Sequence, residues 1–188
     1  MKVLKDILKA NEDRKIIIMP VGISGSGKTT LFKDLKEDFD IEYISFDKIR
    51  VDIYRKNFPE KEDIKYSEVF RYITDNKIKI LPLAKKQLLD SDRRLFYIDN
   101  TNLTKKARRK FLLLCDDCLK IAVYFKPDLK ECIKRQFNKD RDKRLKPSVI
   151  LNQYSAVEKP DFSEFDIIIT KKINGKIDEK GRSDNRCF

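Results

Sequence analysis

The sequence predicts an α/β protein whose parallel sheet of about five strands carries helices on both faces. Apolar runs of strand length alternate along the chain with segments whose apolar residues recur at helical spacing, the pattern of β–α–β units. A glycine-rich loop also separates the first of these strands from a helix. Ligands of such sheets bind beyond the carboxyl ends of the strands, so the functional site is expected there.

The N-terminal half supplies the first two strands. Uninterrupted apolar runs are typical of strands buried in a parallel sheet, whereas apolar residues three or four apart indicate helices. The expected elements are a helix over 2–10, a strand over 15–21, a helix over 28–36, a strand over 41–46 and a helix from 47 to about 57. Phe58-Pro59 ends the last of these helices.

The C-terminal half continues the alternation. The expected elements are a helical segment over 64–90, a strand over 94–99, a helix over 104–118, a strand over 119–125, helices starting near 127 and 147, and a strand over 165–169. Pro82 kinks or starts a helix within the first segment. We expect one domain over 1–170, followed by a polar tail over 171–188 that forms a last short strand or remains irregular.

The composition indicates a globular, basic protein. The 188 residues include 43 Lys and Arg against 31 Asp and Glu, a formal charge of +12. This excess favours a polyanionic partner such as nucleic acid, and a solvated lysine-rich surface is the alternative. The sequence has no histidine, so a general base must be a carboxylate, Lys, Tyr or Cys. Without a signal peptide or an apolar run of membrane-spanning length, a cytoplasmic protein with no membrane partner is expected.

Two cysteines, Cys115 and Cys118, have C-x-x-C spacing. No second pair and no histidine complete a zinc site. The motif also ends a predicted helix instead of starting one, which is the wrong place for a lowered thiol pKa. We therefore predict two reduced structural cysteines.

The loop after the first strand fits G-x-x-x-x-G-K-[ST] and predicts a nucleoside triphosphate site. Its glycines let successive backbone N–H groups turn around phosphate oxygens, and the helix opening at Lys28 adds its positive N-terminal end. Lys28 then reaches the β- and γ-phosphates, and the Thr29 hydroxyl ligates Mg²⁺. The predicted nucleotide-binding residues are Gly22, Ser24, Gly25, Ser26, Gly27, Lys28, Thr29 and Thr30, joined by Arg135 from later in the chain.

Asp47 and Arg50 follow the second strand as an Asp-x-x-Arg pair. An acid at a strand end is placed to accept the proton of an attacking hydroxyl, as a kinase requires. Arg50, one helical turn later, lies on the same side and is suited to hold a substrate phosphate. The alternative is that Asp47 only caps the following helix.

Asp99, Asn100 and Thr101 end the third strand. Asp99 occupies the position of a Mg²⁺-associated acid, and the three residues together are predicted to bind substrate. The polar turn equally suits a helix N-terminus, and the two interpretations are compatible. No Glu follows Asp99, which argues against a motor ATPase.

The charged segment over 134–146 carries Arg135, Arg141 and Arg144 ahead of Pro147. Such a run is often a solvated face. Its arginine spacing instead suggests a lid whose guanidinium groups neutralise charge on a transferring phosphoryl group, an effect worth roughly 10³-fold or more. The predicted catalytic residues are Lys28, Asp47, Arg141 and Arg144.

These motifs together resemble the polynucleotide 5′-hydroxyl kinases of phage and of nucleic-acid repair, over about residues 15–160. The D-N-T-N-L turn beginning at Asp99 and the Asp-x-x-Arg pair carry the resemblance more specifically than the glycine-rich loop. The resemblance implies a P-loop kinase fold with an arginine-bearing helical lid, ATP and Mg²⁺ as cofactors, and transfer of the γ-phosphate to a 5′-OH end of DNA or RNA.

The resemblance also implies roles for individual residues. Asp47 would be the general base on the 5′-OH, and Arg50 would hold the neighbouring nucleic-acid phosphate. Arg141 or Arg144 would contact the transferred phosphate. The acceptor site would be lined by Thr101 with Asp99 or Asn100.

Two other functions remain open at this point. A kinase of the same architecture that acts on a metabolite or sugar nucleotide would use a similar loop, base and lid. A nucleotide-binding switch or a nucleic-acid-binding ATPase would transfer phosphate only to water.

Overall fold

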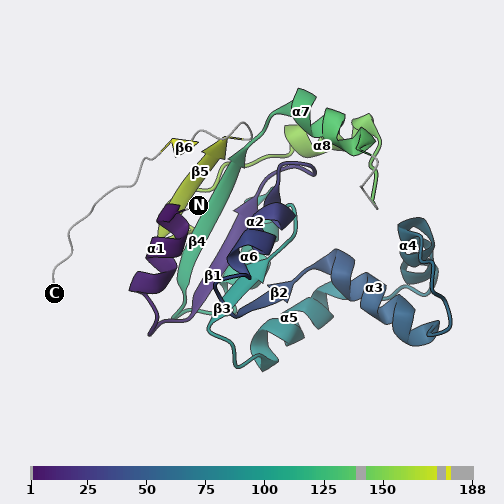
Figure 1. The fold of residues 1–188 in the computed structure, drawn as a ribbon, viewed down its shortest axis with the longest axis horizontal. Helices are drawn as coiled ribbons and strands as arrows, with labels where there is room; N and C mark the ends of the chain where they lie inside the picture. Colours follow the sequence, from purple (N-terminus) through teal and green to yellow (C-terminus); the bar gives the residue numbers. More distant parts are fainter. Residues whose placement is uncertain (1, 139–142, 173–176, 179–188) are drawn as a thin grey trace.

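The computed structural model describes residues 2–138, 143–172 and 177–178. They form a six-stranded sheet in the order β2-β3-β1-β4-β5-β6 (Figure 1). Strands β1 to β5 are parallel, and β6 pairs antiparallel with β5. The strands are β1 Ile16–Val21, β2 Ile41–Ile44, β3 Leu95–Ile98, β4 Leu119–Lys126, β5 Ile167–Lys172 and β6 Ile177–Asp178. The predicted α/β fold with a parallel sheet of five strands is confirmed.

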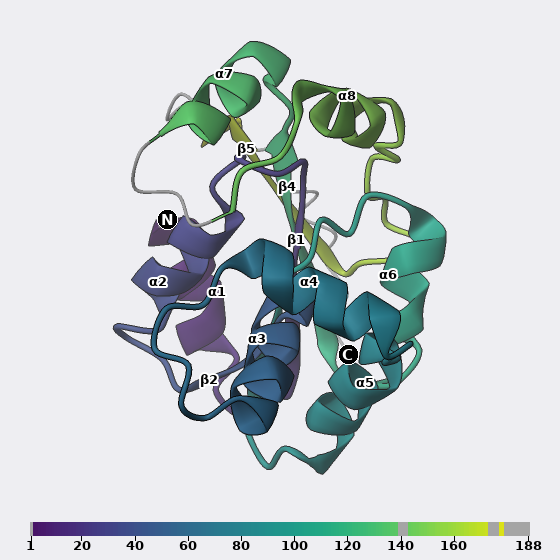
Figure 2. The same cartoon turned by 90° about the vertical axis from the view of Figure 1, so that its right-hand side faces the viewer.

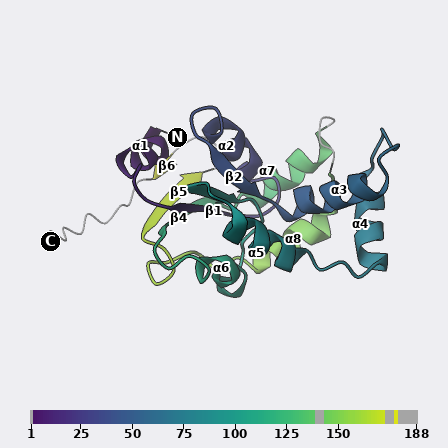
Figure 3. The ribbon, with the colours of Figure 1, turned by 90° about the horizontal axis from the view of Figure 1, so that it is seen from below.

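Helices cover both faces of the sheet (Figure 3). Side chains of α1 and α2 join the core on one face, and those of α5 and α6 join the core on the other. The helices are α1 Lys2–Ala10, α2 Lys28–Leu35, α3 Phe46–Asn57, α4 Tyr66–Asp75, α5 Ile80–Asp90, α6 Lys105–Leu112, α7 Leu129–Lys134, the 3₁₀ helix η1 Arg135–Phe137 and α8 Pro147–Ser155. In the parts of the chain that are described, every helix is too short or too polar to cross a lipid bilayer.

The central strand β1 is buried along its whole length, which explains its unbroken apolar sequence. Ile16 and Ile18 belong to the core with α1 and α2, while Ile17 and Met19 belong to the core with α5 and α6. A strand covered on both faces must present apolar side chains in both directions. The loop that follows β1 therefore starts from a fixed point in the middle of the sheet.

Helix α3 begins at Phe46, one residue earlier than predicted, because Ser45 caps it. The Ser45 hydroxyl accepts a hydrogen bond from the Lys48 N–H at 3.4 Å. Phe46 is apolar and follows a strand, so sequence spacing placed it in that strand. Asp47 lies in the first turn and is not the cap, which removes the alternative interpretation of this residue.

The predicted helical segment over 64–90 contains two helices. Lys77 adopts a left-handed φ of 52° between α4 and α5, which turns the chain. Pro82 lies in the first turn of α5, where a proline ring meets no preceding helical carbonyl. Strand β5 continues to Lys172 and β6 follows it, so regular structure extends past residue 170. The proposed division into a domain and a tail stays a prediction.

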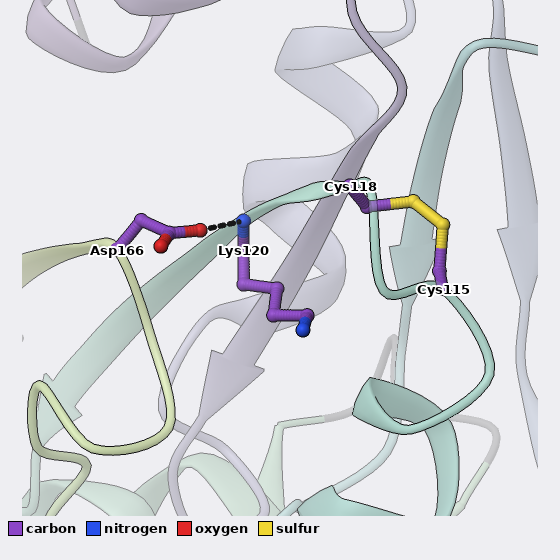
Figure 4. Close-up of a disulfide and its surroundings, with 4 residues drawn as sticks. All are labelled: Cys115, Cys118, Lys120 and Asp166. Atoms are coloured by element: carbon purple, nitrogen blue, oxygen red, sulfur yellow. Dashed lines mark hydrogen bonds between the residues drawn. A yellow bond between two sulfur atoms is a disulfide. The ribbon is translucent and has the colours of Figure 1, made fainter.

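The C-x-x-C segment differs from the prediction. After α6 ends, a tight turn brings the Cα atoms of Cys115 and Cys118 to 5.4 Å, and the two residues form a disulfide at the start of β4 (Figure 4). This separation lies within the range that disulfides require. The prediction of two reduced cysteines is therefore wrong. Cys132 is a free and buried thiol, and Cys187 lies outside the described residues.

Candidate active site

A cleft of about 1130 Å³ opens at the carboxyl ends of β1, β2 and β3. Its lining includes residues of α2, α3, α5, α6, η1 and α8. Figure 2 shows α7 and α8 in the upper part of the view and α3 and α4 below them. The predicted site residues that line the cleft are Ser24, Gly25, Gly27, Lys28, Thr29, Thr30, Asp47, Arg50, Asp99, Asn100, Thr101 and Arg135. The fold therefore brings the phosphate loop and the residues that follow β2 and β3 to one place.

Several predicted site residues lie elsewhere. Gly22 and Ser26 are buried and do not line the cleft. Arg144 is exposed and is not part of the cleft lining. Arg141 lies outside the described residues. The catalytic role of either arginine stays a prediction.

The loop between β1 and α2 has the backbone of an anion cradle. Gly25 and Gly27 have φ values of 92° and 101°, in the left-handed region that favours glycine. A Cβ on Gly25 would lie 2.9 Å from the side-chain nitrogen of Gln136 and 3.0 Å from the Cys132 carbonyl oxygen, so glycine is also required by packing. The Lys28 ammonium donates to the Gly22 and Ile23 carbonyls, each at 2.9 Å. This arrangement suits a phosphate, because the left-handed glycines and the Lys28 ammonium lie at the N-terminus of α2.

Two side-chain oxygens that could ligate Mg²⁺, those of Thr29 and Asp99, lie next to each other beside the loop. The Thr29 hydroxyl donates to Oδ2 of Asp99 at 2.8 Å, and the Tyr43 hydroxyl donates to the same oxygen at 2.5 Å. Hydroxyl and carboxylate oxygens are ligands that Mg²⁺ prefers, and this ion usually takes one or two protein ligands together with water and substrate phosphates. The described residues include no group of three or more His, Cys, Asp or Glu that could hold a metal. The site thus fits Mg²⁺ carried by a nucleotide.

Tyr43 remains a hydrogen-bond donor at this site. Burial, followed by the charge and the hydrogen bond of Asp99, raises the pKa of Tyr43 well above its ordinary value. The phenol therefore stays protonated throughout the physiological pH range. Its hydrogen bond fixes the Asp99 carboxylate next to Thr29.

The turn from Asp99 to Asn102 connects the donor loop to α3. The Thr101 carbonyl accepts the Gly22 N–H at 3.0 Å, and the Asn100 side-chain oxygen accepts the Phe46 N–H at 3.3 Å. Asn102 has a φ of 51° and donates through its side chain to the Pro20 and Ile98 carbonyls, each at 2.9 Å. The turn therefore holds the loop and the start of α3 in a fixed relation.

Asp47 lies in the acceptor half of the cleft and is held by three side chains. Its Oδ1 accepts hydrogen bonds from Arg50 at 2.8 Å and from the Tyr66 hydroxyl. Its Oδ2 accepts a hydrogen bond from the Lys143 ammonium at 2.7 Å. These donors come from α3, from α4 and from the charged segment before α8. Asp47 is thus the meeting point of three elements.

These contacts keep Asp47 ionised. Burial raises the pKa of its carboxyl, but the hydrogen bond and charge of Lys143, with smaller effects of Tyr66 and Arg50, outweigh burial. The resulting pKa lies below the ordinary value of an aspartate. A carboxylate that is ionised at neutral pH can accept a proton, which a general base must do.

The acceptor half combines positive charge with apolar and aromatic surface. The guanidinium of Arg50 lies 5.9 Å from the ring centroids of both Phe46 and Phe70, within reach of cation–π attraction. Phe70 is 52% exposed. Lys110 and Phe111 of α6 also line this half. A ligand with an anionic group and a flat apolar group would meet complementary side chains here.

The lid side of the cleft contacts the donor loop directly. Arg135 donates to the Gly25 carbonyl at 3.1 Å and to Glu131 at 2.8 Å. The side-chain oxygen of Gln153 on α8 accepts the Ser24 N–H at 2.8 Å. Arg135 therefore lies beside the phosphate loop, and its role in nucleotide binding stays a prediction.

Sequence reasoning missed Tyr43, Tyr66, Lys143 and Gln153. Lys143 lies in the same charged segment as the predicted lid arginines, so the charge of that segment was a usable signal. The tyrosines lie in stretches whose apolar spacing alone was considered. No local pattern distinguishes them from ordinary core-facing residues.

Comparisons with known proteins agree with this architecture. The AAA domain family model matches residues 17–160. A gluconokinase from Sinorhizobium meliloti 1021 is similar at a TM-score of 0.55 and 16% identity, covering 83% of this chain and 82% of that chain. Kti12 from Chaetomium thermophilum in complex with ADP-AlF3 has a TM-score of 0.53 and 14% identity, covering 83% of this chain and 88% of that chain.

A third solved structure comes from the PezAT chromosomal toxin-antitoxin system of Streptococcus pneumoniae. It has a TM-score of 0.55 and 18% identity, covering 94% of this chain and 75% of that chain. Likenesses at such low identity establish the fold, which is that of P-loop kinases. No curated protein matches the chain.

Proposed function

The chain belongs to the AAA domain family, and from this premise we propose that it is an ATP-dependent polynucleotide 5′-hydroxyl kinase acting in nucleic-acid repair. One observation carries the proposal. A single cleft has the phosphate loop with Lys28 at one end and an ionised Asp47 beside Arg50 at the other. A donor site facing a general base with an adjacent cation is what transfer to a hydroxyl next to a phosphate requires.

In this proposal the loop and Lys28 hold the β- and γ-phosphates of ATP. Thr29 and Asp99 hold Mg²⁺, which when bound shields phosphate charge. Catalysis then consists mainly of positioning and charge neutralisation. Kti12, which shares the fold, was solved in complex with ADP-AlF3, and this supports nucleotide binding at the loop of the present chain.

The residues of this cleft account for every bond and proton in the transfer step. The acceptor oxygen forms a bond to the γ-phosphorus while its proton passes to the Asp47 carboxylate. The bond between the γ-phosphorus and the bridging oxygen breaks, and its electron pair stays on ADP. Asp47 later releases the proton to solvent. Arg50 holds the acceptor phosphate that neighbours the reacting hydroxyl.

A small-molecule kinase is the competing function, and the gluconokinase among the similar structures favours it. The polynucleotide proposal has two supports of its own. The formal charge of the chain is +12, and Arg50, which lines the cleft, lies 5.9 Å from the ring centroid of the exposed residue Phe70. A base and a phosphate of one nucleotide would fit these two groups.

The test is an acceptor panel with γ-labelled ATP. The panel contains 5′-OH DNA, 5′-OH RNA, nicked duplex, free nucleosides and gluconate, and it is run with wild type and with Asp47→Ala. We expect label on polynucleotide 5′ ends, and a loss of transfer of roughly 10²- to 10⁴-fold in the variant with ATP binding retained. The exposed variant Asp52→Ala on the same helix is the control. Label appearing on small acceptors or as free phosphate alone would refute the polynucleotide assignment, and an active Asp47→Ala would refute the base.

A further inference from the structure

We propose that Lys143 is the lid cation that neutralises the transferring phosphoryl group, and that Asp47 holds it at the cleft until substrates bind. This inference rests on the proposed phosphoryl transfer and adds a catalytic residue to it. The sequence pointed to arginines of the lid instead. The geometry of the described lid residues points to a lysine.

Lys143 reaches across the cleft from the lid side. It precedes α8, it is half-buried, and it lines the cleft. Its ammonium lies 2.7 Å from Oδ2 of Asp47, 3.4 Å from the Tyr66 hydroxyl and 4.5 Å from the centroid of the Tyr66 ring. The positive charge is therefore fixed in the acceptor half, although its backbone belongs to the lid.

Other described cations of the lid are not placed for this task. Arg135 lines the cleft beside the phosphate loop, but its guanidinium is already engaged by Glu131 and by the Gly25 carbonyl. Arg144 and Lys146 are exposed and lie off the cleft lining. Among the lid cations that the structure describes, Lys143 is thus the one that lines the cleft and contacts Asp47.

The two oxygens of Asp47 have different partners, and this difference assigns their roles. Oδ1 accepts from Arg50 and Tyr66, which belong to the adjacent helices α3 and α4. Oδ2 accepts from Lys143, which the lid contributes. Lys143 belongs to neither α3 nor α4, so the hydrogen bonds of Arg50 and Tyr66 to Oδ1 do not depend on its contact with Oδ2. Oδ2 is therefore the oxygen that becomes free to receive the proton of the acceptor.

The resulting exchange is balanced. When the acceptor hydroxyl approaches Oδ2, the Lys143 ammonium moves from Asp47 to an oxygen of the γ-phosphate and stays protonated. The hydroxyl proton passes to Oδ2, the acceptor oxygen bonds to phosphorus, and the electron pair of the broken bond remains on ADP. Lysine suits the task because its charge is compact and its four-carbon stem is flexible.

The experiment compares Lys143→Met, Lys143→Arg and the exposed control Lys146→Met. The first readout needs no acceptor: affinity for ADP is measured with and without aluminium fluoride, which mimics the transferring phosphoryl group. We expect wild type and Lys146→Met to gain affinity when the fluoride is added, Lys143→Met to lose most of that gain, and Lys143→Arg to keep part of it. Affinity for ADP alone should stay close to wild type in all the variants.

The second readout is turnover with the best acceptor of wild type. We expect kcat of Lys143→Met to fall roughly 10²- to 10³-fold, the usual cost of one charge-stabilising donor. The acid limb of kcat/KM should also move to higher pH. Asp47 would keep its contacts with Arg50 and Tyr66, but without Lys143 the pKa of its carboxyl would rise. A Lys143→Met that keeps both the fluoride gain and kcat overturns the inference. A wild type that shows the fluoride gain but no transfer to any acceptor overturns the proposed function and leaves the role of Lys143 standing.

Discussion

The hydrogen bond from Tyr66 helps to keep Asp47 ionised, and only the ionised carboxylate can act as a base. The Tyr66 hydroxyl donates to Oδ1 and lowers the pKa of Asp47, while burial and Asp47 raise the pKa of Tyr66 so that it stays a donor. Removing this hydroxyl favours the protonated carboxyl. The activity carried by ionised Asp47 is then lost at a higher pH than in wild type.

We therefore expect Tyr66→Phe to shift the acid limb of the kcat/KM profile to higher pH while leaving kcat near pH 8 largely intact. Tyr72→Phe, on the same helix but packed against Tyr54 and Phe58, should leave the profile unchanged. The measurement is kcat/KM from about pH 4 to pH 9, which spans the ordinary pKa of a carboxyl. An unshifted acid limb in Tyr66→Phe would show that the hydroxyl does not tune Asp47.

The sequence identified the donor residues better than the partners of the base, for a physical reason. The phosphate loop is local, because its function requires glycines, Lys28 and Thr29 at fixed spacing. Tyr66 and Lys143 are 19 and 96 residues from Asp47 and meet it through tertiary packing alone. The spacing of apolar residues along the sequence cannot predict such long-range contacts. Arg144 is predicted from charge alone; it is exposed, and its catalytic role stays a prediction.

At the level of helices and strands, apolar periodicity succeeded where both faces of the sheet are covered. It predicted β1 because every side chain of that strand is buried. It failed between α4 and α5, since apolar residues continue at helical spacing across the left-handed turn at Lys77. It also failed at the disulfide turn, which depends on how α6 enters β4. Backbone turns and covalent links are set by geometry that apolar spacing does not encode.

Helix α6 is fixed to the site by a buried ion pair. Arg108 is fully buried and pairs with both oxygens of Glu164, at 3.0 and 2.6 Å. Its guanidinium also donates to the Asn102, Leu103 and Glu158 carbonyls, at 3.1, 3.1 and 2.8 Å. The pair thus connects α6 and the segment before β5 to the turn that carries Asp99.

We expect Arg108→Ala to lower the free energy of unfolding by about 3–5 kcal/mol, because Glu164 loses its ion-pair partner and three carbonyls each lose a hydrogen bond. The exposed neighbour Arg109→Ala should change it by less than about 0.5 kcal/mol. Urea unfolding of both variants at neutral pH measures the difference. Equal stability of the two variants would contradict a structural role for the buried arginine.

At the level of the whole molecule, the residues of the cleft come from two separate sets of elements. The donor loop and Asp99 follow β1 and β3 at the middle of the sheet, whereas Asp47, Arg50 and Tyr66 belong to α3 and α4 at its β2 edge. Lys143, from the segment before α8, contacts Asp47 on α3. The residues around Asp47 therefore come from other elements than the phosphate loop does.

The charge of the whole chain gives a test of the acceptor class. A formal charge of +12 favours association with a polyanion. If the acceptor is a single strand, each phosphate contact releases counterions, and the slope of log affinity against log salt becomes more negative by about 0.7 per contact. A nucleoside acceptor at the same site releases no counterions from a phosphate backbone. Its affinity should depend little on salt.

We therefore expect the KM of a 5′-OH oligonucleotide to rise steeply between about 50 and 200 mM salt, and more steeply for a longer strand. The KM of a nucleoside should change little over the same range, and the KM of ATP serves as the internal control for the donor site. Initial rates at fixed pH, with chloride as the varied salt, give all three values. Equal salt dependence of oligonucleotide and nucleoside would mean that the basic surface makes no contact with the strand, and the small-molecule kinase would then be the better assignment.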